Sequence, residues 1–179
     1  MSSRDVETSP LATWSERLAR RVAPDEIDLA PDLAVAYATG GADRRALFDG
    51  PRADPGAFGA GAAMFLPVVF DALAASYTVV KGFLGDPAVG SLLATASLVA
   101  AVRSRRAGTG APRTNPPGED AEVARRADAA VEEVRSQLEA KGAPSDLAAD
   151  AAVSAVGVLA EDPAGAMLFL DDLARPPLP

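Results

Sequence analysis

The fold depends most on residues 61–85, which read GAAMFLPVVFDALAASYTVVKGFLG. Apolar residues occur at every angle around a helix drawn through this stretch, and its only charged residues are Asp71 and Lys81. A helix that is apolar all round is buried, either in protein or in lipid. Pro67 either marks the true start of this helix or kinks it, because proline cannot donate a backbone hydrogen bond.

A second apolar segment follows directly. Asp86 and Pro87 are typical of a helix N-cap and first helical position, and residues 87–102 read PAVGSLLATASLVAAV. The segment ends in a basic cluster, Arg103, Arg105 and Arg106, which we predict to face a partner. The two segments together predict an apolar helical hairpin over residues 61–102, turning at residues 82–85.

Amphipathic helices are predicted on both sides of this hairpin. The first begins at Ser9 and Pro10, and shorter ones cover about residues 31–39 and 43–48. Residues 107–118 are rich in proline and glycine and predict a flexible linker. Three further helices are expected over residues 119–175, the second capped by Ser145 and the third started by Asp162 and Pro163.

The chain is therefore predicted to be all-α: a helical bundle around a central apolar hairpin, with a C-terminal three-helix unit after the linker. The expected division is an N-terminal helical region over residues 1–106, a linker over residues 107–118 and the three-helix unit over residues 119–175. The β-branched runs do not predict strands, because they lie inside longer helical patterns.

Composition excludes several classes of function. The 179 residues contain 17 Lys and Arg against 25 Asp and Glu, a net charge of −8, which disfavours nucleic-acid binding. Cysteine and histidine are both absent, so the commonest nucleophile, general base and metal ligands are absent too. We expect no catalytic, cofactor or metal site and no enzymatic activity.

Location follows from the same sequence. The first residues, MSSRDVETSP, lack the apolar core of a secretory signal, so a cytoplasmic location is expected. Arginine greatly outnumbers lysine, which is typical of a bacterial protein encoded at high GC content.

Residues 61–80 have the length that a membrane span needs, which gives an alternative location in the inner membrane. Their eight Phe, Leu and Val residues favour insertion by about 2.4–4.8 kcal/mol in total, while Asp71 opposes it by about 2.5–3.5 kcal/mol. The sum is close to zero, so burial against the flanking amphipathic helices is favoured over lipid.

Asp71 is the residue most unusual for its surroundings, because an ionisable group in an apolar helix is costly unless it is paired. We predict an ion pair, with Arg44 or Arg45 as partner, and a functional site as the alternative. Ser76 and Lys81 are five residues apart, which points them in different directions and excludes a serine–lysine catalytic pair. Asp171 and Asp172 are interpreted as solvated or helix-end charges.

Without a catalytic motif, the favoured function is a protein–protein interaction or adaptor module, binding another protein or a second copy of itself. The alternative is a small membrane-associated effector that inserts the hairpin over residues 61–102.

Overall fold

The computed structural model describes residues 10–48, 64–87, 89 and 119–175. Throughout these residues the regular structure is helical and no strand occurs, so the all-α prediction is confirmed for the described part of the chain. The predicted linker, the arginine cluster at residues 103–106 and most of the second apolar segment lie outside the described residues.

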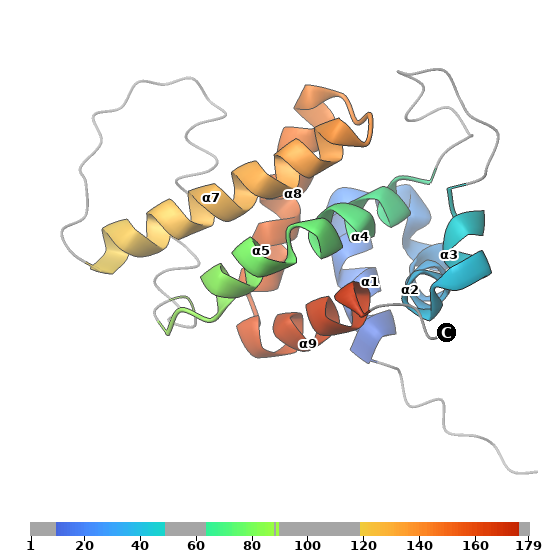
Figure 1. Cartoon of the computed structure of the whole chain (residues 1–179), viewed down its shortest axis with the longest axis horizontal. Helices are drawn as coiled ribbons and strands as arrows, with labels where there is room; N and C mark the ends of the chain where they lie inside the picture. Colours follow the sequence, from blue (N-terminus) through green and yellow to red (C-terminus); the bar gives the residue numbers. More distant parts are fainter. Residues whose placement is uncertain (1–9, 49–63, 88, 90–118, 176–179) are drawn as a thin grey trace, which may run out of the picture.

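Two short helices lie end to end at the centre of the molecule: α4 (Phe65–Ala75) and α5 (Tyr77–Leu84). Figure 1 shows them between α7 (Glu119–Ala140) on one side and α9 (Pro163–Ala174) on the other, and both contact both helices. Eight of the eleven residues of α4 are buried, as expected for a helix that is apolar on all sides.

Of the two roles expected for Pro67, the structure shows the helix start, because α4 begins at Phe65. Pro67 thus lies in the first turn, where its missing N–H has no intrahelical partner to lose. The break at Ser76, between α4 and α5, was not predicted. At Ser76 the backbone has φ −86° and ψ 7°, and α4 and α5 are bent by 75°. The side chain of Ser76 is buried, and its Oγ has no hydrogen-bond partner.

The N-terminal helices pack on one end of this centre. They are α1 (Pro10–Val22), the 3₁₀ helix η1 (Pro24–Leu29), α2 (Ala30–Thr39) and α3 (Gly41–Ala46). Helix α1 contacts α2, α8 (Ser145–Ala160) and α9, whereas α3 packs mainly against α2. Gly40 and Gly41 have φ of 76° and 59°, values that let the chain turn sharply from α2 into α3.

Aromatic side chains join the N- and C-terminal helices in one core. Trp14 of α1 stacks on Phe169 of α9, with ring centroids 6.0 Å apart. Phe70 of α4 lies edge-on to both Phe169 and Tyr37 of α2. Helices 10–48 and 119–175 therefore bury their apolar faces against each other and against α4.

Within the described residues, no single helix combines the length and the apolar composition that crossing a membrane requires. The bent pair of α4 and α5 meets that test only when the two helices are counted together.

Candidate functional site

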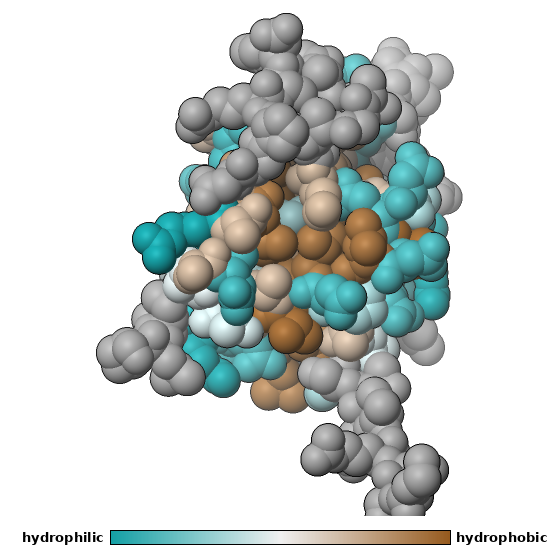
Figure 2. All heavy atoms as spheres, turned by 90° about the vertical axis from the view of Figure 1, so that its right-hand side faces the viewer, coloured by the Kyte–Doolittle hydropathy of each residue, from teal (hydrophilic) through white to brown (hydrophobic). Residues whose placement is uncertain are grey.

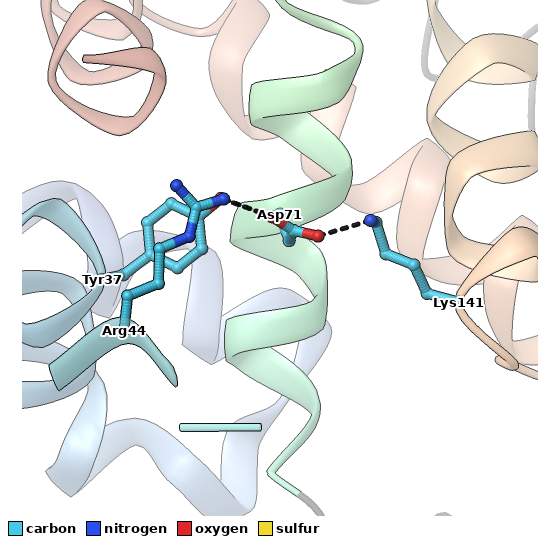
Figure 3. A network of polar contacts seen from close by, with 4 residues as sticks. All are labelled: Tyr37, Arg44, Asp71 and Lys141. Atoms are coloured by element: carbon cyan, nitrogen blue, oxygen red, sulfur yellow. Dashed lines mark hydrogen bonds and ion pairs between the residues drawn. The ribbon is translucent and has the colours of Figure 1, made fainter. Parts of the chain in front are cut away.

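Four polar side chains meet at the middle of α4, and we call them the Asp71 cluster: Tyr37, Arg44, Asp71 and Lys141. Tyr37 donates a hydrogen bond to Asp71 Oδ1 over 2.8 Å, and Arg44 donates to the same oxygen and to the Tyr37 hydroxyl. Lys141 forms an ion pair with the other oxygen, Oδ2. Figure 3 shows Arg44 and Lys141 on opposite sides of the carboxylate. The cluster thus fastens α4 to two other parts of the chain.

Turn geometry brings both cations to Asp71. The left-handed conformation of Gly40 and Gly41 starts α3 in the direction that places Arg44 one turn later beside α4. Helix α7 ends in a turn where Gly142 has φ 92° and the N–H of Ala143 bonds to the carbonyl of Leu138. That turn presents Lys141, the residue before the glycine, to α4.

Burial in the Asp71 cluster is partial. The side chains of Arg44, Asp71 and Lys141 are 31%, 24% and 27% exposed. Burial alone would raise the pKa of Asp71, but the hydrogen bonds from Lys141, Tyr37 and Arg44 outweigh it, so the pKa is lower than usual. For Tyr37, burial and then the hydrogen bond to Asp71 raise the pKa far above its ordinary range. Near neutral pH the carboxylate is ionised and the phenol carries its proton.

The Asp71 cluster holds α4 in place against α2, α3 and the end of α7. The guanidinium of Arg44 lies 4.0 Å from the centre of the Tyr37 ring, where it gains a cation–π contact as well as the ion pair. The single carboxylate faces two cations and one phenol donor, so its oxygens are engaged in binding other parts of the chain. Among the described residues, no group of three or more acidic, cysteine or histidine side chains could hold a metal ion.

A second cluster of a tyrosine, a cation and a carboxylate joins two helices: Tyr77 and Lys81 lie on α5, and Asp171 lies on α9. Lys81 Nζ is 2.6 Å from both the Tyr77 hydroxyl and Asp171 Oδ1. The hydrogen bonds from Lys81 and Tyr77 lower the pKa of Asp171, and the bond to Asp171 raises the pKa of Lys81. Asp171 is 41% exposed and lies near the end of α9, as expected, but it also pairs with a lysine 90 residues earlier in the chain, which the sequence did not predict.

A third polar contact fixes the start of α4. The carboxylate of Glu26, on η1, accepts hydrogen bonds from the backbone N–H groups of Phe65 and Leu66, the latter over 2.9 Å. The first N–H groups of a helix lack intrahelical acceptors and carry partial positive charge. Glu26 therefore acts as a cap supplied from a distant segment.

The sequence predicted that Asp71 forms an ion pair, and it predicted one of the two cations that bind it. Of the two arginines proposed, Arg44 reaches Asp71, while Arg45 Nε donates to the carbonyl of Gly41 instead. Sequence reasoning missed Tyr37, Lys141 and Glu26. For Lys141 the only signal was its place beside the helix-ending Gly142, which says where a helix stops but not which carboxylate is near.

One outward surface stands apart from these internal contacts. We call it the α2 face, formed by Asp28, Leu29, Asp32, Val35 and Thr39. All five are exposed. Asp28 and Leu29 lie at the end of η1, and Asp32, Val35 and Thr39 follow at steps of three and four residues on one side of α2. Figure 2 looks onto the side of the molecule where α2 and α3 lie, and shows apolar atoms gathered at its middle among hydrophilic ones.

Fold and sites together define an all-α protein in which two tyrosine–cation–carboxylate clusters fasten a bent central helix pair. No protein-family model matches the sequence, and neither a curated protein nor a solved structure matches it at a significant level.

Proposed function

We propose that the protein is a non-enzymatic interaction module that binds another protein through the α2 face. The observation that supports this is the exposure of two large apolar side chains on that face: Leu29 is 46% exposed and Val35 is 50% exposed. Leu29 ends η1 and Val35 lies on α2, the helix that follows it directly. Single exposed apolar residues are common on protein surfaces, whereas apolar groups gathered in one patch are typical of contact sites.

The remainder of α2 supports this assignment. Its opposite side, with Leu33, Ala34 and Tyr37, is buried in the core and anchored by the Asp71 cluster. The α2 face is therefore presented on a rigid element, which keeps its side chains in place for a partner. Covering the apolar groups on this face with a partner would be favourable, because it removes apolar surface from water.

The test is affinity capture with the full chain as bait in three forms. Val35→Asp places a charge in the α2 face, and Leu168→Asp makes the same change at a 64% exposed leucine of α9. Both variants should keep the circular dichroism spectrum of the original chain, because neither residue is buried. The proposal expects a discrete partner that the original chain and Leu168→Asp retain and Val35→Asp loses. Equal recovery by all three forms would contradict it.

Membrane association is the second proposal, and the bent pair of α4 and α5 is the observation that favours it. In the structure α4 is covered by α2, α7 and α9, so insertion would require these helices to separate from it. Carbonate washing of cell membranes tests this: retention of the chain in the washed membranes supports insertion, and complete release argues against it.

A further inference from the structure

We propose that the segment bound by the α2 face is an amphipathic helix whose apolar stripe is flanked by lysine or arginine. This inference rests on the proposed function and specifies the chemistry of the partner. Three observations support it: the spacing of the exposed residues, the charge of the surface, and the like charges that a second copy of the chain would place against that surface.

Spacing favours a helix as the bound element. Along the α2 face, Leu29, Asp32, Val35 and Thr39 follow one another at steps of three or four residues. A partner helix packs along such a row through its own residues at positions i, i+3, i+4 and i+7. Ala36, half-buried beside Val35, is small enough to let another backbone approach closely.

Charge selects a basic partner. Asp28 and Asp32 lie on the face itself, and Asp25 and Asp43 are exposed on η1 and at the start of α3. On α3, the charge of Arg44 is balanced by Asp71, while Arg45 donates to the neutral carbonyl of Gly41 and keeps its charge. Four exposed aspartates against this one arginine leave the surface acidic. Complementary charge across an interface speeds association and rejects partners of the same sign.

The same charges disfavour a second copy of this chain as the occupant. A symmetric dimer uses one patch on both subunits, so it would bring Asp28 and Asp32 of one copy against the same acids of the other. Like charges at close range oppose such a contact. A basic helix, in contrast, buries Leu29 and Val35 and neutralises both aspartates.

The probe is an 18-residue synthetic model helix with a leucine stripe flanked by lysines. Its control is the same peptide with glutamate in place of each lysine. Fluorescence anisotropy measures the affinity of each peptide for the full chain. We expect the lysine peptide to bind at least about tenfold more tightly than the glutamate peptide, because each charge on the rim contributes modestly and several act together.

Matched variants of the protein separate the α2 face from general attraction to an acidic chain. Asp32 and Asp146 are both exposed acids in the first turn of a helix, α2 and α8 respectively. Asp32→Asn should weaken binding of the lysine peptide about threefold to tenfold, and Asp146→Asn should leave it unchanged. Val35→Ser should weaken it about tenfold, and Leu168→Ser should not.

Several outcomes would overturn the inference. Equal loss in Asp32→Asn and Asp146→Asn would show attraction by net charge alone, and equal affinity for both peptides would show no charge selection. A dimer of the original chain that Val35→Asp dissociates would assign the face to a second copy. If the lysine peptide fails to bind while affinity capture still finds a partner that depends on Val35, the partner chemistry is wrong and the proposed function stands.

Discussion

At the scale of single residues, Asp71 is the point where three separate parts of the chain meet. Its carboxylate receives donors from α2, α3 and the turn between α7 and α8. A charge placed in an apolar helix would by itself oppose folding, and the three donors reverse that effect. Asp71, the charged residue of an apolar helix, thus fixes how α4 lies against the elements around it.

Replacing the carboxylate of Asp71 tests how much it contributes to the stability of the fold. Asp71→Asn leaves Arg44 and Lys141 facing a neutral amide, and we expect the free energy of unfolding to fall by about 1–3 kcal/mol. Urea denaturation followed by circular dichroism measures the change. Asp43→Asn, at an exposed acid of α3, is the control and should stay within about 0.5 kcal/mol. A loss no larger than that of the control would mean that the cluster contributes little.

The lowered pKa of Asp71 should make the stability of the protein depend on pH. The pKa of Asp71 is lower in the folded chain than in the unfolded chain, where it is about 3.9. As the pH falls the unfolded chain binds the proton first, so the stabilisation is complete above about pH 4 and lost as the pH drops through the folded-state pKa. The stability gap between the original chain and Asp71→Asn should therefore be constant from about pH 7 to 5 and shrink below about pH 4. Urea titrations across this range measure it, and a gap that closes at higher pH would contradict the assignment.

Part of this site could be predicted from sequence, for a physical reason. A carboxylate in an apolar helix must find a cation, and the arginines at positions 44 and 45 were proposed as partners, although no feature of the sequence fixes that choice. Lys141 lies 70 residues away, and its approach depends on how α7 crosses α4. Such crossing is set by packing of whole helices, which local sequence does not encode.

At the scale of elements, the start of α4 depends on a residue outside it. Met64 precedes the helix in an extended conformation and provides no side-chain cap, while Glu26 supplies the acceptors from 39 residues earlier. A helix beginning with four apolar residues has no capping group of its own, so the sequence predicted that the helix exists but left its first residue open between Gly61 and Pro67.

Removing this carboxylate should loosen the beginning of α4. We expect Glu26→Ala to lower the free energy of unfolding by about 1 kcal/mol, because two N–H groups lose an ionised acceptor. Amide hydrogen exchange at Phe65 and Leu66 should quicken more than elsewhere in α4. Asp25→Ala, its exposed neighbour, serves as control, and similar exchange in both variants would argue against the cap.

The break at Ser76 is a helix boundary that the spacing of apolar residues does not predict. Apolar residues continue in helical register from Phe70 to Val80, so no local signal marks the bend of 75°. Two helix starts with chemical markers were placed well: α1 begins at Pro10, and Asp162 accepts a hydrogen bond from the N–H of Gly165 at the start of α9. Ser145 was expected as a cap, but it is the first residue of α8, which has no side-chain cap. The bend at Ser76 has no such marker, because it results from packing.

At the scale of the whole molecule, helices from both ends of the chain share one core. Trp14 stacks on Phe169, and Arg17 of α1 forms an ion pair with Glu161 over 3.3 Å. Helices α4 and α5 contact α7 and α9 along their length (Figure 1). The described helices before the predicted linker and those after it thus depend on each other for burial of their apolar faces.

This sharing predicts a single cooperative unfolding transition. Trp14 is the only tryptophan in the chain, so its fluorescence reports on the contact between α1 and α9, while circular dichroism reports on all helices. We expect the two urea denaturation curves to coincide, as they do when one core unfolds as a unit. Two separate transitions would show instead that the N-terminal region and the C-terminal unit unfold independently.

The lysines have a consequence for chemical labelling. The chain contains only two, and both lie in tyrosine–carboxylate clusters: Lys81 beside Asp171 and Lys141 beside Asp71. The raised pKa of Lys81 leaves less of the neutral amine that acylating reagents attack, so it should react slowly while the fold is intact. Amine-directed cross-linkers are therefore a poor choice for trapping a partner on the α2 face. Carbodiimide coupling through Asp28 and Asp32 would join that face directly to the amines of a lysine-rich partner.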